Sequence, residues 1–103
     1  MSYEKVAGVS EIPKGSMRSV RVGNEEVMVA NVDGKFYALR NRCTHVGGPL
    51  AKGKLSGYVV QCPWHGSKFD VRTGSVVGPP ASAPEPTFEV KVENNAVMIK
   101  KPS

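Results

Sequence analysis

The sequence predicts an all-β domain, with an antiparallel strand base of the sandwich or barrel type and a loop-rich insert. Short runs of β-branched residues recur about every eight to twelve residues, a spacing typical of such folds. Few stretches have helical periodicity, and the 103 residues include eleven glycines and eight prolines. A chain of this length suits one domain. We therefore expect residues 1–103 to form a single unit.

The N-terminal part predicts a series of strands joined by tight turns. Gly23-Asn24 and Asp33-Gly34 are residue pairs that favour two-residue hairpin turns, and Pro13-Lys14-Gly15 is also typical of a turn. The strands expected between these turns cover residues 3–6, 17–22, 26–32 and 35–40. Consecutive strands should therefore pair antiparallel.

Residues 41–80 have a different composition. Glycine and proline are dense there, and only residues 58–61 and 68–71 resemble strands. After a proline-rich segment, residues 87–93 and 96–100 predict a hairpin across Asn94-Asn95. We expect residues 1–40 and 81–103 to form the base, and residues 41–80 to form an insert on it.

The insert contains both cysteines and both histidines of the chain. They form Cys43-x-His45 and, after sixteen intervening residues, Cys62-x-x-His65. Each half can direct one thiolate and one imidazole toward a common centre. This donor set suits zinc, copper, iron and iron–sulfur centres, so the donors alone leave the metal open.

The residues around these donors resemble the two cluster-binding boxes of Rieske-type ferredoxins. The first box reads Cys43-Thr44-His45-Val46-Gly47-Gly48-Pro49-Leu50, and the second reads Cys62-Pro63-Trp64-His65-Gly66-Ser67-Lys68-Phe69-Asp70. Gly78-Pro79-Pro80 is similar to the proline loop that covers the cluster in that family. The resemblance implies a Rieske iron–sulfur domain with a [2Fe-2S] cluster, one iron bound by Cys43 and Cys62 and the other by His45 and His65.

The resemblance also implies which residues surround the cluster. They are Gly47, Gly48, Pro63, Trp64, Gly66, Ser67, Phe69, Pro79 and Pro80. High-potential members of the family have additional cysteines at the positions of Gly48 and Trp64, so their bridging disulfide cannot form here. Ser67 keeps a hydroxyl that donates to cluster sulfur in the family, but Phe69 lacks the second hydroxyl. We expect a reduction potential below that of the respiratory-complex members.

The function implied by the resemblance is one-electron transfer, without catalysis by the chain itself. The setting expected is a multi-protein redox system, in which the chain passes electrons from a reductase to a terminal oxygenase that attacks aromatic rings. A carrier in another redox pathway is equally compatible. A small subunit of a larger reductase, such as a nitrite reductase, ranks lower, because such relatives often lack the ligands.

The charge distribution suggests how a partner would bind. The net charge is +5 and the sequence pI is about 9.4. Between residues 40 and 72, one acid, Asp70, stands against six bases: Arg40, Arg42, Lys52, Lys54, Lys68 and Arg72. We expect an electropositive cluster end that docks an acidic patch on a redox partner; an ordinary solvated face is the alternative.

Other interpretations of the same residues are weaker. A Cys43–Cys62 disulfide leaves the histidines unexplained, and zinc fingers usually group two cysteines in one half and two histidines in the other. A zinc-stabilised nucleic-acid-binding module would need a basic recognition helix, which this sequence lacks. We therefore expect no nucleic-acid partner. The N-terminus has no signal-peptide pattern and no apolar run is long enough to cross a membrane. We therefore expect a cytoplasmic protein without membrane contact. We also expect a monomer.

Overall fold

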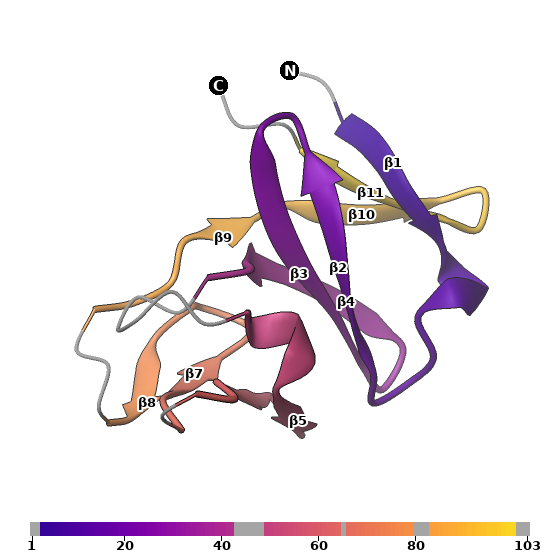
Figure 1. Ribbon diagram of the computed structural model, residues 1–103. Coiled ribbons are helices and arrows are strands. Elements are labelled where there is room, and N and C mark those ends of the chain that lie inside the picture. Colours follow the sequence, from indigo (N-terminus) through magenta and orange to yellow (C-terminus); the bar gives the residue numbers. More distant parts are fainter. Residues whose placement is uncertain (1–2, 43–48, 65, 80–82, 101–103) are drawn as a thin grey trace.

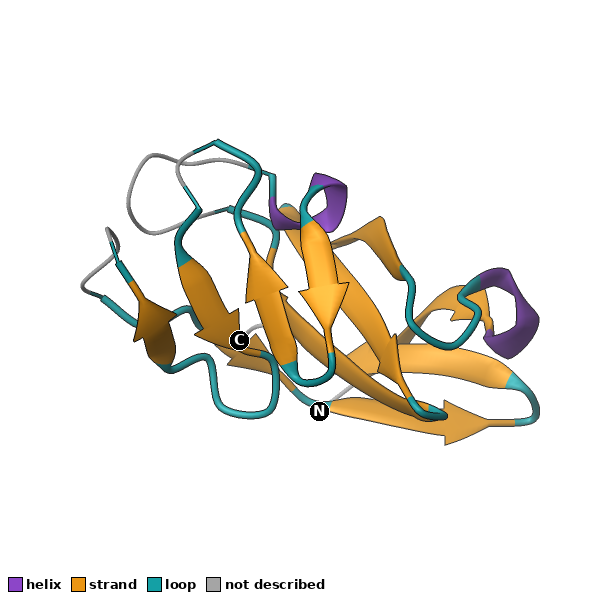
Figure 2. Cartoon of the chain, turned by 90° about the horizontal axis from the view of Figure 1, so that it is seen from below, coloured by secondary structure: helices purple, strands orange, loops and turns teal. Residues whose placement is uncertain are grey.

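The computed structural model describes residues 3–42, 49–64, 66–79 and 83–100. In this part of the chain, the secondary structure consists of strands and two short 3₁₀ helices, η1 (Val9–Glu11) and η2 (Leu50–Lys52), as Figure 2 shows. The all-β prediction is confirmed. No helix in these residues is long and apolar enough to span a membrane.

The strands form three antiparallel sheets. The outer base sheet has the order β1-β11-β10, the middle sheet β2-β3-β4-β9, and the cap sheet β5-β6-β7-β8. The base strands are β1 (Tyr3–Gly8), β2 (Met17–Val22), β3 (Glu25–Val32), β4 (Lys35–Arg40), β9 (Thr87–Phe88), β10 (Val90–Glu93) and β11 (Ala96–Lys100). The cap strands are β5 (Lys54–Ser56), β6 (Val59–Gln61), β7 (Lys68–Asp70) and β8 (Val76–Gly78).

The predicted hairpins are present in the base. β2 pairs with β3, β3 with β4, and β10 with β11. The turn residues Asp33, Asn94 and Asn95 have φ of 55°, 52° and 62°. Asparagine and aspartate tolerate this left-handed conformation better than other non-glycine residues, which is why such pairs predict tight hairpins.

Strand β3 is buried on both faces and joins two hydrophobic cores. Because side chains alternate along a strand, Val27 and Val29 pack in the core shared with the outer base sheet. Met28 and Ala30 point the other way, into a core shared with the cap residues Val60, Cys62 and Phe69. The middle sheet therefore lies between the other two, and Figure 1 shows β1, β10 and β11 on one side of it and β5, β7 and β8 on the other.

Two sequence predictions need correction. Residues 87–93 do not form one strand: β9 pairs with β4 and β10 pairs with β11, because the chain crosses between two sheets near residue 89. The insert is also more regular than predicted, since residues 54–78 contain a four-stranded sheet. The sequence did not predict the short strands β5 and β8, whose place in the sheet depends on their pairing with β6 and β7.

Candidate metal centre

Cys62 lies at the start of a tight loop between β6 and β7. The Cys62 N–H donates to the Ser67 carbonyl oxygen over 2.7 Å, and the Gly66 N–H donates to the Cys62 carbonyl oxygen over 3.2 Å. Gly66 has φ of 80°, a conformation that favours glycine. These two hydrogen bonds fix the loop with which the second box begins.

The Cys62 side chain is buried, with 2% of the residue exposed, in the core between cap and middle sheet. It borders a cavity of about 280 Å³ lined by Lys52, Gly53, Lys54, Gln61, Cys62, Pro63 and Gly66. A Cβ atom on Gly53 would lie 1.9 Å from the Gln61 carbonyl oxygen. The segment that follows the first box can therefore approach the strand before Cys62 only because residue 53 is glycine.

The two ends of the first box are held together by Asn41. Its Oδ1 accepts a hydrogen bond from the Ala51 N–H over 2.7 Å, and its Nδ2 lies 3.3 Å from both Ser19 Oγ and Glu26 Oε2. The residue is 7% exposed. Asn41 precedes the first box and Ala51 follows it, so one buried side chain closes the base of this loop.

The start of the third loop lies beside the end of the second box. Gly78 pairs with Lys68 across β7 and β8. A Cβ on Gly78 would meet the Lys68 Cβ at 3.1 Å, so the two strands are in close contact there. The bases of all three loops thus meet at the same end of the cap sheet: Asn41 with Ala51, Gly53 with Gln61, and Lys68 with Gly78.

The sequence-predicted site residues divide into two groups. Cys62, Pro63, Trp64, Gly66, Ser67, Phe69 and Pro79 lie in the described part of the chain. Cys43, His45, Gly47, Gly48, His65 and Pro80 lie outside the described residues. Within the described ranges, no three His, Cys, Asp or Glu side chains gather as a metal site, which is expected when three of the four predicted ligands are not among them.

Three residues of the second box have environments relevant to a cluster. Ser67 and Phe69 are completely buried, and Phe69 packs in the same core as Cys62. Trp64, between the predicted ligands Cys62 and His65, has 57% of its surface exposed. It is therefore a surface residue rather than a core aromatic.

The six basic residues of the 40–72 region do not share one environment. Arg42, Lys52, Lys54 and Lys68 are exposed, and no carboxylate of the described residues lies within ion-pair distance of them. Arg40 is different, because its Nε faces Oε1 of the buried Glu85 across 4.0 Å. The predicted basic end therefore has fewer contributors than the sequence suggested.

Arg72 lies at the opposite end of the β6–β7 hairpin from Cys62. It binds both carboxylate oxygens of Asp70, over 3.1 and 2.8 Å, and its guanidinium carbon lies 4.1 Å from the Tyr58 ring centroid. The hydrogen bonds from Arg72 lower the pKa of Asp70 and, reciprocally, raise the pKa of Arg72. Arg72 thus neutralises Asp70 and adds nothing to the electropositive end near Cys62.

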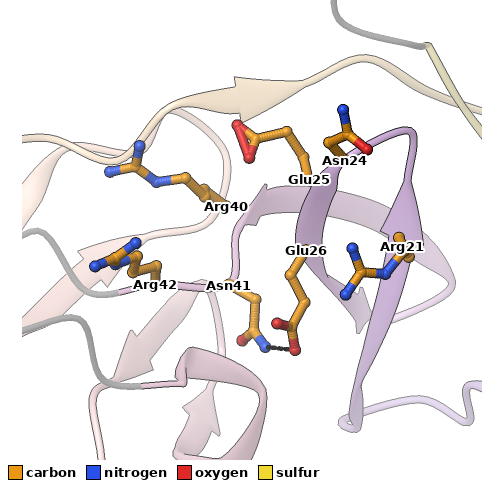
Figure 3. Close-up of a pocket in the computed structure, with 7 residues that line it drawn as sticks. All are labelled: Arg21, Asn24, Glu25, Glu26, Arg40, Asn41 and Arg42. Atoms are coloured by element: carbon orange, nitrogen blue, oxygen red, sulfur yellow. Dashed lines mark hydrogen bonds between the residues drawn. The ribbon is translucent and has the colours of Figure 1, made fainter.

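Sequence reasoning missed two features of this region. One is the role of Asn41, which sequence alone could not separate from a generic loop asparagine. The other is a polar cavity of about 400 Å³ beside the first box, lined by Arg21, Asn24, Glu25, Glu26, Arg40, Asn41 and Arg42 (Figure 3). Arg21 and the two glutamates are far in sequence from the boxes, so only the β2–β3–β4 pairing could bring them there.

The fold is a small β protein with two base sheets and a four-stranded cap, and it places a buried cysteine at the tip of a cap hairpin. The Rieske [2Fe-2S] domain model matches residues 2–93. The chain therefore belongs to the Rieske [2Fe-2S] family, and its cofactor is a [2Fe-2S] cluster.

Several known proteins are similar over nearly the whole chain. The biphenyl dioxygenase ferredoxin subunit of Pseudomonas sp. (strain KKS102) is 37% identical, over 96% of this chain and 92% of its own length. The solved ferredoxin of carbazole 1,9a-dioxygenase from Nocardioides aromaticivorans IC177 superposes with a TM-score of 0.96 at 27% identity, covering 99% of this chain and 100% of that one.

A chain from the complex of reduced oxygenase and oxidized ferredoxin in carbazole 1,9a-dioxygenase has a TM-score of 0.89 at 38% identity, covering 94% of this chain and 91% of that one. Apoptosis-inducing factor 3 of Mus musculus is 39% identical over 92% of this chain. The match spans only 16% of that longer protein.

Proposed function

We propose that this chain is the ferredoxin component of an oxygenase system, with its cluster bound by Cys43, His45, Cys62 and His65. The observation that carries the ligand assignment is the position of Cys62: a buried sulfur beside a cavity, where the bases of three loops meet. The other three ligands are proposed from the motif. Family membership and ferredoxin relatives of the same length support the role.

The donor set of the sequence and the described geometry beside Cys62 fit the cofactor. The chain offers two thiolates and two imidazoles, a donor set suited to an iron–sulfur centre. A glycine at residue 53 permits the close approach of two backbone segments beside Cys62. When bound, a Rieske cluster supplies a one-electron couple at a higher potential than an all-cysteine cluster.

The chain's own residues act on this couple by burial and hydrogen bonding. The hydrophobic core that contains Cys62 and Phe69 excludes water from the Cys62 sulfur. Ser67 places a buried hydroxyl in the loop of Cys62, where a donor would stabilise the more negative reduced state. Phe69 offers no hydroxyl, so the chain has one side-chain donor fewer than high-potential members.

The proposed electron path leads from a reductase to a terminal oxygenase. The name of the biphenyl relative and the oxygenase–ferredoxin complex of the carbazole system support this direction. The exposed Arg42, Lys52 and Lys54 next to the loop bases support docking through a basic end. The chain acts as a carrier in such a system, and catalysis belongs to the oxygenase.

Metal and sulfide analysis of freshly purified protein tests this proposal. We expect two irons and two acid-labile sulfides per chain, visible colour, and an electron paramagnetic resonance signal that appears on reduction. Cys62→Ser should abolish the iron, the sulfide, the colour and the signal. A colourless protein that contains zinc instead would refute the proposal.

A further inference from the structure

The outer face of the cap sheet carries an exposed groove of about 510 Å³. It is lined by Lys54, Ser56, Val59, Gln61, Lys68 and Val77, and we call this surface the lysine face. Its opposite side packs Val60 and Phe69 into the core. The groove therefore lies on the side of the cap that points away from the base.

The strand register explains why the two lysines share this face. Lys54 pairs with Gln61, and Gln61 pairs with Lys68. Directly paired residues on antiparallel strands project to the same face of the sheet. This row is also the one nearest to the cluster loop, because Gln61 immediately precedes Cys62.

The lysine face is electropositive. No carboxylate of the described residues lies within ion-pair distance of Lys54 or Lys68. Asp70 pairs with Val59 and so projects from the same face, but both of its oxygens bind Arg72. The arginine-lined cavity of Figure 3 is less favourable for an anion, because Glu25 and Glu26 also line it.

The lysine face also presents apolar side chains. Val77 is 52% exposed, and it lies at an irregularity in the β7–β8 pairing, where Lys68 pairs with Gly78 but Phe69 pairs with Val76. Val59, on β6, lines the same groove and is half-buried. Protein interfaces combine apolar contacts with polar and charged residues around them.

We propose that the lysine face is the docking surface for an acidic patch on a redox partner protein, with an apolar contact at Val77. This inference rests on the proposed electron-carrier function and names the surface through which it operates. Two copies of this chain would bring four lysines together, so charge complementarity favours an acidic partner over self-association. A docked partner would sit next to the Cys62 loop.

The test uses the holoprotein and flavodoxin in its anionic hydroquinone form, as an acidic redox probe. One electron passes from the hydroquinone, which becomes the neutral semiquinone, to the oxidised holoprotein, and stopped-flow absorbance measures the second-order rate. The double variant Lys54→Gln/Lys68→Gln should react about fivefold more slowly at low ionic strength. Its rate should also depend less on salt.

Matched controls separate a local docking surface from net charge. Lys5→Gln/Lys35→Gln removes the same charge from exposed base positions and should react like wild type. Val77→Ser should lower the rate at high salt about twofold, whereas Val92→Ser, at a base valine that is 51% exposed, should not.

The outcomes distinguish this inference from the proposed function. Equal slowing by both lysine pairs, or slowing by neither, would overturn the lysine face as the docking surface. Binding of a labelled single-stranded oligonucleotide that is lost only in Lys54→Gln/Lys68→Gln, with the electron-transfer rate unchanged, would assign the face to nucleic acid instead. A protein without cluster absorbance that dithionite cannot reduce would refute the function itself.

Discussion

Replacing Asn41 by alanine should loosen the loop that contains Cys43 and His45. The substitution removes the acceptor for the Ala51 N–H at 2.7 Å and two longer contacts at 3.3 Å. A net hydrogen bond is worth about 1 kcal/mol, and an unsatisfied backbone donor costs about 1–3 kcal/mol. The free energy of unfolding should therefore fall by about 2–3 kcal/mol.

The assay compares global stability with cluster retention. At about 4–8 °C per kcal/mol for a domain of this size, the melting temperature should fall by about 8–24 °C. Visible absorbance, recorded at a temperature below the unfolding transition of both proteins, follows cluster loss. If the cluster is lost by local opening of the loop base, its release should be at least about tenfold faster than in wild type.

Asn31 offers a matched control. It is also a buried asparagine, 4% exposed, and its side chain donates to the Ile12 carbonyl oxygen over 2.7 Å and accepts from the Gly34 N–H over 2.8 Å. Asn31→Ala should lower the melting temperature by a similar amount without accelerating cluster loss. Equal cluster loss in both variants, or none in Asn41→Ala, would refute the reasoning that Asn41 holds this loop closed.

Three further predictions follow from the cap. Potentiometry should show that Ser67→Ala lowers the midpoint potential and Phe69→Tyr raises it, because a hydroxyl near the cluster stabilises the reduced state; midpoints that do not move would mean that neither position supplies a hydrogen bond. Arg72 lowers the pKa of Asp70 in the folded protein. The Asp70 carboxylate therefore stabilises the fold at pH values above its pKa in the unfolded chain, about 3.9. This stabilisation is lost as the pH falls through the pKa of Asp70 in the folded state. Urea unfolding should thus show Asp70→Asn less stable than wild type at pH 7, with the gap closing in acid; a gap that is independent of pH would exclude the charge as its cause. Gly53→Ala places a Cβ 1.9 Å from a strand carbonyl oxygen, so we expect protein with a much lower melting temperature and little bound iron, and a variant with wild-type iron content would show that the two segments can separate freely.

The base of the fold could be predicted well from the sequence. Turn pairs such as Asp33-Gly34 and Asn94-Asn95 have a local conformational preference that requires no tertiary context, and they gave the correct hairpins. The crossing of the chain between two sheets near residue 89 could not be predicted, because the β-branched pattern of residues 87–93 is continuous while the pairing partner changes.

The sequence predicts the candidate site as a set of residues, but it could not predict the contacts that hold the loops around Cys62. The spacing of the cysteines and histidines identified the boxes, and the structure places Cys62 and Ser67 in one closed loop. That Asn41 closes the first loop, and that residue 53 must be glycine, depends on contacts with Ala51 and Gln61 that arise only in the folded chain. The charge distribution has the same limit. The sequence counted Arg72 among the bases of the cluster end, but in the fold it pairs with Asp70 beside Tyr58, away from that end.

The most direct test of the ligand assignment uses the fact that this chain has only two histidines, His45 and His65. Pulsed electron paramagnetic resonance of the reduced protein, labelled with ¹⁵N-histidine, detects nitrogen that is bound to the paramagnetic centre. Coordination of one iron by both imidazoles predicts two strongly coupled ¹⁵N nuclei, and His65→Cys should leave one. A spectrum without strongly coupled nitrogen would contradict the assignment.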